Sequence, residues 1–190
     1  MDMQQRAMEI FTETGVLLEG HFLLTSGRHS DRYMQCARVF QYADKAGELC
    51  AALAAQFNGI DVVIGPAVGA VQMAYEVSRH LGCRNLFTER DTDGKMVLRR
   101  GFALTPGERV LVVEDTVTTG GTVREVIEYV ESLGGVVAGV GSIVDRSGGK
   151  VDFGVPFKAV ATVDVTSWEA ADCPLCKAGS VAVKPGSRKI

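Results

Sequence analysis

The hydrophobic positions near the start of the chain follow a helical period and then change to short runs. Met3, Ala7, Ile10 and Phe11 recur at helical spacing, and Gly15 can end that helix in a left-handed conformation. The stretch "GHFLLTSGRHSDRYMQCARVFQ" then interrupts short apolar runs with Thr-Ser-Gly and Ser-Asp. Such punctuation predicts a strand, a turn and a second strand. The chain is therefore expected to open with a helix and a hairpin.

From there on, helical faces alternate with short continuous apolar runs. Ala46, Leu49, Leu53 and Phe57 share one helical face, which stops at Asn58-Gly59, and a second helix runs from Val71 to Gly82. The expected strands are "DVVIG", "NLFTE", "KMVLRRGFAL", "RVLVVED", "VVAGVGSIVD" and "FKAVATVDV". β-branched runs that alternate with helices are typical of a parallel sheet covered on both faces. The fold class is therefore predicted to be α/β, with a central, mainly parallel sheet flanked by helices.

The helix after "RVLVVED" has the clearest sequence signals. Its start, Thr122-Val-Arg-Glu125, matches a capping box, in which a threonine and a glutamate cap each other's backbone N–H groups. Val123, Val126, Ile127 and Val130 form its inner face, and Gly134-Gly135 ends it. These signals predict a helix from Thr122 to Leu133.

Composition narrows the class of protein. With 190 residues and 46% hydrophobic content, the chain is long enough for one domain with a full core. The net charge is −3 and the basic residues are scattered, so neither nucleic acid nor a membrane is the expected partner. No uninterrupted apolar run reaches 18 residues, and the N-terminal "MDMQQRAMEIF" lacks the charge pattern of a signal peptide. The expectation is a cytoplasmic protein that acts on small molecules.

The five cysteines do not form the dense, even set of a disulfide scaffold. They are Cys36, Cys50, Cys83, Cys173 and Cys176. The motif "CPLC" could be half of a zinc site, but a four-coordinate site needs a second pair of ligands and no second CxxC exists. A local turn with two ordinary reduced thiols is favoured, and a metal or redox role stays open.

The stretch "EDTVTTGGT", residues 114–122, occupies the place where α/β sheets bind ligands, beyond the carboxyl end of a strand. Backbone N–H groups around Gly120 and Gly121 and at the start of the following helix can cradle a phosphate. Thr116, Thr118, Thr119 and Thr122 add hydroxyl groups. Neither GxxxxGK[ST] nor GxGxxG is present, so this is not a nucleoside triphosphatase loop or a dinucleotide fingerprint.

The acidic pair Glu114-Asp115 directly precedes this cradle. Two carboxylates next to a phosphate repel it unless they hold something neutral, hydroxyl-rich or cationic that is attached to the phosphate. A ribose 5-phosphate meets that condition, with its diol on the acids and its phosphate in the loop.

These motifs together resemble a known family. "VLVVEDTVTTGG" resembles the phosphoribosyl diphosphate motif of the type I phosphoribosyltransferases, and "GPAVGA", residues 65–70, resembles their diphosphate-binding loop. "GHFLLTSGRHSDRYMQ" is similar to the hood of the orotate-specific members, with Ser26-Gly27-Arg28, Ser30 and Tyr33 in register. The resemblance implies one phosphoribosyltransferase domain over residues 1–190. Its hood would comprise about residues 1–40 plus a C-terminal segment, and its core about residues 41–165.

The resemblance also implies roles for particular residues. Glu114 and Asp115 would hold the ribose. Arg90 and Lys95, from the basic loop 89–101, would stabilise the leaving diphosphate. The expected catalytic residues are Glu114, Asp115 and Lys95. The expected phosphoribosyl diphosphate contacts are Glu114, Asp115, Thr116, Val117, Thr118, Thr119, Gly120, Gly121, Thr122, Arg90 and Lys95, and the expected orotate contacts are Thr118, Arg146 and Tyr33. Taken without the family, Tyr33 is better explained by packing, and Arg146 could equally be a surface arginine.

The implied reaction transfers phosphoribosyl from 5-phosphoribosyl 1-diphosphate to orotate, giving orotidine 5′-phosphate and diphosphate for pyrimidine biosynthesis. Magnesium (Mg2+) would arrive on the diphosphate, with no direct protein ligand, and loop 89–101 would reach a neighbouring site in a homodimer. Thr25 and Gly69 depart from the family, because many members have lysine at both positions. The alternatives are another base as acceptor, or a non-catalytic regulator that binds the sugar diphosphate.

Overall fold

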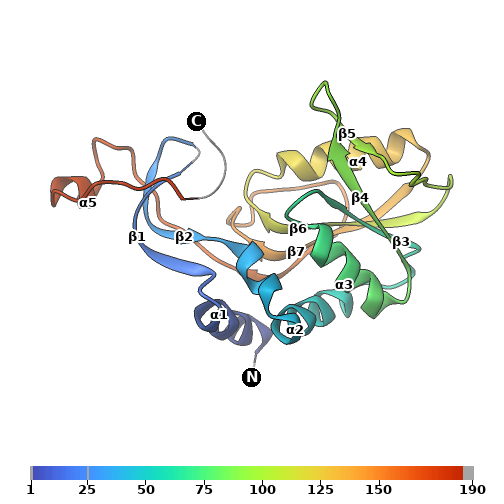
Figure 1. Cartoon of the computed structure of the whole chain (residues 1–190), viewed down its shortest axis with the longest axis horizontal. Helices are drawn as coiled ribbons and strands as arrows, with labels where there is room; N and C mark the ends of the chain where they lie inside the picture. The colour runs from blue at the N-terminus through green and yellow to red at the C-terminus, as the bar shows by residue number, and fades with distance from the viewer. Residues whose placement is uncertain (1, 25, 186–190) are drawn as a thin grey trace.

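A six-stranded sheet forms the centre of the protein (Figure 1). The computed structural model describes residues 2–24 and 26–185. The strands lie in the order β5-β4-β3-β6-β7-β8, and every pair is parallel except the edge pair β4–β5. Their bounds are β3 Val62–Pro66, β4 Arg84–Arg90, β5 Met96–Leu98, β6 Arg109–Val117, β7 Val136–Asp145 and β8 Phe157–Thr162. The predicted α/β class is confirmed, and β5 is shorter than the predicted strand.

Helices cover both faces of this sheet (Figure 1). Side chains alternate between two hydrophobic clusters: along β6, Leu111 and Val113 pack with α1, α2 and α3, whereas Val110 and Val112 pack with α4. The helices are α1 Met3–Glu13, α2 Ala43–Ala54, α3 Val71–Leu81 and α4 Gly121–Ser132. Among the described residues, no helix combines the length and the apolar character needed to cross a bilayer.

A small antiparallel hairpin stands beside this sheet. It is formed by β1 Leu17–Leu23 and β2 His29–Met34, followed by the 3-10 helix η1 Cys36–Gln41. Figure 1 shows the segment of residues 166–183, with α5 Pro174–Lys177, along this hairpin and away from the sheet. We call residues 17–34 the hairpin and residues 166–183 the C-terminal segment.

The C-terminal segment is tied to the hairpin at two places by backbone hydrogen bonds. Trp168 and His29 exchange N–H···O bonds of 2.8 Å in both directions. Further along, the Val183 N–H donates to the His21 carbonyl at 2.8 Å, and the Leu23 N–H donates to the Val183 carbonyl at 2.9 Å. The chain between these two ties includes α5.

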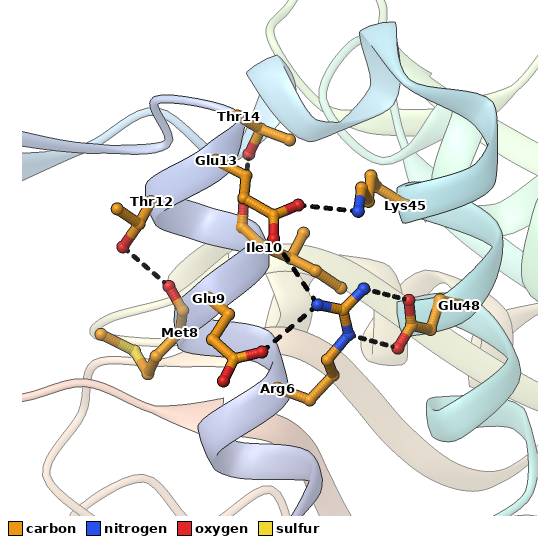
Figure 2. Close-up of polar contacts among 9 residues, drawn as sticks. All are labelled: Arg6, Met8, Glu9, Ile10, Thr12, Glu13, Thr14, Lys45 and Glu48. Carbon is orange, nitrogen blue, oxygen red and sulfur yellow. Dashed lines mark hydrogen bonds and ion pairs between the residues drawn. The ribbon is translucent and has the colours of Figure 1, made fainter. Parts of the chain in front are cut away.

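Charged side chains join α1 to α2 at the surface (Figure 2). The Arg6 guanidinium donates to both carboxylate oxygens of Glu48, at 2.7 and 2.9 Å, and to Glu9 at 3.3 Å. Glu13 lies 3.6 Å from Arg6 and 2.7 Å from the Lys45 ammonium. The apolar side of α1, with Ala7, Ile10 and Phe11, belongs to the hydrophobic cluster beneath. The charged network therefore lies at the solvent-exposed edge of the α1–α2 contact, whose interior is stabilised by apolar burial.

Candidate functional site

The acidic pair lies inside a strand. β6 continues to Val117 because it stays in register with β7 up to the pair Val117↔Asp145, so Glu114 and Asp115 are strand residues. The predicted strand "RVLVVED" includes both acids but ends at Asp115, two residues before the end of β6, so the loop begins later than predicted. The loop between β6 and α4 is only residues 118–120. The acids are therefore held by sheet hydrogen bonds rather than by a free loop.

Gly120 makes the turn from β6 into α4 possible. Its φ is 75°, and a Cβ at this position would lie 2.8 Å from a ring carbon of Phe153. Both the left-handed backbone and the close approach require glycine. Gly120 is the N-cap of α4, and no side chain caps this helix. The predicted capping box is therefore wrong: Thr122 lies within the first turn, and the Glu125 carboxylate accepts hydrogen bonds from Arg90.

The loop and helix start expose groups that suit a phosphate. Thr118 and Thr119 are exposed, and Gly121 begins α4. The first N–H groups of a helix have no acceptor within the helix, and its dipole favours an anion there. The predicted cradle, with Val117 and Thr122 at its two ends, is thus arranged around one helix N-terminus at the carboxyl end of β6.

The loop "GPAVGA" lies beside the acids. It follows β3, and a Cβ on Gly65 would lie 2.8 Å from the Ala70 carbonyl oxygen, so the turn closes tightly on itself. The peptide between Ala67 and Val68 is cis. A Cβ on Gly69 would lie 3.6 Å from the Asp115 Oδ2. Any longer side chain at position 69 would therefore begin next to this carboxylate. The other departure from the family, Thr25, lies outside the described residues.

Asp115 is half-buried in this setting. Burial raises the pKa of its carboxyl group, and hydrogen bonds with Thr116 and Glu114 oppose the rise. The Asp115 N–H donates to the Glu114 Oε1 at 3.3 Å, and the Thr116 hydroxyl donates to the Cys36 thiol at 2.9 Å. Burial also raises the Cys36 pKa to about 12, so this thiol stays protonated. Cys36 is a site neighbour that sequence reasoning missed, since η1 carries no motif.

Arg146 follows β7 directly and faces the same region. Its Nε is buried with no hydrogen-bond partner, and burial lowers the pKa of its guanidinium. A buried guanidinium nitrogen without a partner is costly unless an acceptor arrives. The neighbouring Asp145 accepts the Ser147 N–H at 2.7 Å, and the Arg146 N–H donates to Val117 at 2.8 Å. Asp145 therefore stabilises the turn that carries Arg146. The sequence "DRSGG" is typical of a turn in which an aspartate side chain accepts the N–H two residues on, so it could have predicted this role.

Tyr33 brings the hairpin to this site. It is half-buried on β2, with its ring centroid 5.8 Å from that of Phe22. The Tyr33 and Cys36 side chains lie close enough to raise the Arg146 pKa electrostatically. The structure thus brings Tyr33 and Arg146 together, although their sequence positions are far apart.

The two basic residues of loop 89–101 lie at the sheet edge. Arg90 ends β4 and donates hydrogen bonds to the Gly94 carbonyl and to Glu125. Lys95 has an exposed side chain, and its backbone N–H donates to Asp91 at 2.9 Å. Their proposed contact with a leaving group in a neighbouring subunit stays a prediction.

A surface hollow lies at the opposite end of the sheet, where β3, β4 and β6 begin. Its lining includes Asp61, Arg84 and Glu108. Asp61 accepts the Arg109 N–H at 2.8 Å, and Arg84 pairs with Glu108 at 2.9 Å. Because these charges are already paired and the hollow is open, it makes a weaker ligand site than the carboxyl ends of the strands.

Residues 39–171 match the family described as phosphoribosyl transferase domain. This stretch includes the sheet, both loops beside the acids, and Arg146. The chain therefore belongs to the phosphoribosyltransferase family.

Within this family, the similar proteins have a more specific name. The chain is 57% identical to the orotate phosphoribosyltransferase of Caldanaerobacter subterraneus subsp. tengcongensis, over 98% of this chain and 99% of that protein. It is 60% identical to the orotate phosphoribosyltransferase of Pelotomaculum thermopropionicum, over 95% and 96% of the two chains. The crystal structure of orotate phosphoribosyltransferase from Aeropyrum pernix superposes with a TM-score of 0.71 at 27% identity, covering 82% of this chain and 92% of that one.

Proposed function

We propose that this enzyme transfers the phosphoribosyl group of 5-phosphoribosyl 1-diphosphate to orotate, giving orotidine 5′-phosphate and diphosphate in pyrimidine biosynthesis. The proposal rests on sequence identities of 57% and 60%, over nearly the full length of the chain, to two proteins named for this activity. The observation that carries it in the structure is the acidic pair Glu114-Asp115 beside a helix N-terminus, with the unpartnered Arg146 Nε nearby. A purine as acceptor would leave this guanidinium without a carboxylate.

Each part of the donor substrate has a suitable partner. The 5-phosphate would lie at the start of α4, on the N–H groups and hydroxyls of residues 118–122. The ribose diol would donate hydrogen bonds to Glu114 and Asp115, and the diphosphate would lie along residues 65–70. Contacts to the 5-phosphate, the ribose diol and the diphosphate would hold the anomeric carbon in a fixed position for the reaction.

The reaction breaks the bond from the anomeric carbon to the diphosphate oxygen and forms a bond to the orotate ring nitrogen, whose proton passes to solvent. The diphosphate leaves with the bonding electron pair, so positive charge develops on the sugar, as in glycoside cleavage. The carboxylates of Glu114 and Asp115 would stabilise that charge. Arg146 would pair with the orotate carboxylate, and Tyr33 and Thr118 would bound the base.

Magnesium fits this site as a companion of the substrate. It usually binds one or two carboxylates together with substrate phosphates and keeps several waters. When bound, it would neutralise charge on the departing diphosphate. The proposal therefore keeps magnesium on the diphosphate, near Glu114 and Asp115.

The remaining parts of the proposal concern the assembly and its location. Arg90 and Lys95 would contact the diphosphate of a neighbouring subunit, which requires a homodimer. The enzyme would work in the cytoplasm, where its five cysteines, all unpaired in the structure, would stay reduced.

The first test is consumption of orotate, followed by its ultraviolet absorbance, with phosphoribosyl diphosphate and magnesium present. Asp115→Asn is expected to lower kcat/KM by about 10- to 150-fold, because a hydrogen bond to a charged group contributes about 1.5–3 kcal/mol. Glu128→Gln, an exposed acid on α4, serves as the matched control and should keep full activity. Orotate that stays unconsumed with the parent protein would end the proposal.

The same variant separates loss of function from loss of folding. The folded-state pKa of Asp115 lies above its ordinary value because of burial. A carboxyl group whose pKa is raised in the folded state costs stability as pH rises above its ordinary value, so this cost is present at pH 7. Asp115→Asn should therefore melt at a higher temperature than the parent at pH 7, and this advantage should vanish once the pH falls well below the ordinary aspartate pKa of 3.8. A lower melting temperature at pH 7 would show that the carboxylate has a structural role.

Arg146→Ala tests the assignment of the base. Loss of the carboxylate contact should raise KM for orotate by about 10- to 100-fold and leave KM for phosphoribosyl diphosphate within about threefold. Lys150→Ala removes an exposed cation from the same loop and should change neither. Equal effects on both KM values would place Arg146 outside the base site.

A further inference from the structure

Two histidines of the hairpin and two cysteines of the C-terminal segment form one cluster. His21 lies on β1, His29 begins β2, Cys173 is the N-cap of α5, and Cys176 lies within α5. Their ligand atoms all lie within 4.8 Å of one another. His21 and Cys173 are 152 residues apart in sequence, so the tertiary fold brings them together.

We propose that His21, His29, Cys173 and Cys176 bind one zinc ion, which fastens the C-terminal segment to the hairpin. The second pair of ligands that "CPLC" lacks in the sequence comes from the two histidines. This site is separate from the acidic pair and the phosphate cradle, and it is independent of the proposed transfer reaction.

The spacing of the ligand atoms fits a tetrahedral zinc ion. Zinc binds thiolates at about 2.3 Å and imidazole nitrogens at about 2.0–2.1 Å, so tetrahedral ligand atoms lie about 3.3–3.8 Å apart. The Cys173 Sγ lies 3.4 Å from the His21 Nε2, and the Cys176 Sγ lies 3.6 Å from the same nitrogen. The Cys176 Sγ lies 3.2 Å from the His29 Nδ1, and the two ring nitrogens are 2.9 Å apart. The remaining ligand atoms lie up to 4.8 Å apart, so side-chain shifts of about an ångström or less would bring all four to tetrahedral spacing around the ion.

The chemistry of the ligands selects the metal and its role. Two sulfur and two nitrogen ligands in a tetrahedron are typical of zinc, and two thiolates neutralise its charge. Four protein ligands leave no open position for water or substrate, which is the mark of a structural site. Binding would release the two thiol protons as the metal–sulfur bonds form.

The surroundings support the ligands. The His21 Nδ1 lies 3.2 Å from the Ser180 hydroxyl, an outer contact that would orient the ring and fix which nitrogen faces the ion. The Cys173 carbonyl accepts the Lys177 N–H at 3.1 Å, and the Cys176 carbonyl accepts the Gly179 N–H at 2.9 Å. The turn that carries both thiols is thus held by its own backbone.

The burial pattern supports a structural role for the cluster. His21 is the only buried residue of β1, and Cys173 is the only buried residue of the described segment 166–183. Where the hairpin meets this segment, polar metal-binding side chains occupy the interior that apolar side chains would otherwise fill. Buried histidines and thiols gain little by contact alone, whereas a shared ion would bind all four.

The first measurement is the metal content of the reduced, full-length protein after dialysis against metal-free buffer. We expect about one zinc per chain. Replacement by cobalt(II) should give the visible absorption and the near-ultraviolet sulfur-to-metal band of a tetrahedral thiolate site. A reduced protein that holds no zinc and takes up neither zinc nor cobalt(II) would overturn the proposal.

Variants then test the four ligands. Cys176→Ser and His29→Gln should each lower zinc content at least tenfold, and Cys83→Ser and His80→Gln, which change a thiol and an imidazole outside the cluster, should leave it unchanged. Cys176 is only half-buried, so its serine variant should still fold, which circular dichroism checks. Full zinc content in Cys176→Ser would contradict the assignment.

Removing the ion tests its structural role. A strong chelator should speed amide hydrogen exchange in residues 17–34 and 166–183 while leaving exchange in β3, β6 and β7 unchanged. Equal changes throughout the protein, or none, would show that the ion does not fasten this segment. Because these readouts do not depend on orotate, failure of the zinc site and failure of the proposed reaction are distinguishable.

Discussion

The sheet and the hairpin of this protein are stabilised in different ways. The strands and helices of the sheet bury two continuous sets of apolar side chains, one on each face. Among the described residues of the hairpin, the buried ones are His21 on β1 and His29, Ser30 and Met34 on β2, and three of these four are polar. The hairpin therefore depends on hydrogen bonds, ion pairs and, by our proposal, a metal ion.

This difference matches the roles that we propose for the two regions. Apolar burial grows with the number of packed layers, and a two-stranded hairpin with a single covering segment has too little of it to be stable alone. The sheet holds Glu114 and Asp115 in a strand, where by our proposal they bind the sugar. The hairpin brings Tyr33 close to Arg146 from a separate element, and Arg28 and the His/Cys cluster connect this hairpin to the C-terminal segment.

The largest effect on this comparison is expected from Leu111→Ala, in the sheet. Leu111 is fully buried between β6 and the α2–α3 face, so the truncation leaves a cavity and should cost about 2–5 kcal/mol of unfolding free energy. Thermal unfolding should show a midpoint lower by about 5–15 °C. Val136→Ala, at a position 47% exposed, should move it by less than about 2 °C. Similar midpoints for the two variants would contradict a core held by apolar burial.

Gly120→Ala acts on the junction between the sheet and the phosphate cradle. The new Cβ would meet Phe153 and impose a left-handed backbone on alanine, at a combined cost of about 1–3 kcal/mol. Binding of phosphoribosyl diphosphate, followed by calorimetry, should weaken more than stability falls, because the loop must move away from Phe153. Gly107→Ala also has a positive φ, 86°, but no atom within 4 Å, so it measures the backbone strain alone. Equal losses in the two variants would mean that contact with Phe153 is unimportant.

Arg28→Ala is expected to loosen the hairpin and leave the sheet intact. Arg28 donates to the Ser167 hydroxyl at 2.9 Å and to the Ser167 carbonyl at 2.7 Å, and it pairs with Glu169. Loss of about 1 kcal/mol should speed amide exchange in the C-terminal segment about fivefold, with the global melting temperature nearly unchanged. Arg32→Ala, which removes an exposed contact within the hairpin, should not affect that segment. A large fall in the global melting temperature would show that the hairpin and the sheet unfold together.

The sequence was most informative where local signals and function coincide. The order of strand, acids, threonines and glycines predicted the junction between β6 and α4 at which we place the candidate site, because each of these signals is local in the sequence. The capping box was wrong for a non-local reason: Gly120 turns against Phe153, which is 33 positions further on, and the helix starts from that contact. Likewise, β6 extends past the acids because it pairs with β7. The hydrophobic pattern of a single strand carries no information on this pairing.

The His/Cys cluster shows the same limit more strongly. "CPLC" indicated half of a metal site, but nothing local in the sequence connects it to His21 and His29. The register of the hairpin and the two backbone ties of the C-terminal segment create that proximity. The unpartnered Arg146 Nε is also a property of the folded site alone, because burial depends on the packing around β7. Tertiary contacts therefore decide which motif residues meet.

The smallest effect is expected from Glu48→Gln, at the edge of the α1–α2 contact. The Arg6 guanidinium beside Glu48 lowers the pKa of that carboxyl group below 4.5, so its stabilisation is present above that pH and is lost as pH falls through the lowered value. The variant should melt no more than about 3 °C below the parent at pH 7, since the pair is exposed, and at the same temperature near pH 2. High salt should shrink the difference at pH 7, and Glu128→Gln should show none. If the variant melts equally far below the parent at both pH values, Glu48 stabilises the protein by packing. The α1–α2 contact would then depend on apolar burial, as the sheet does.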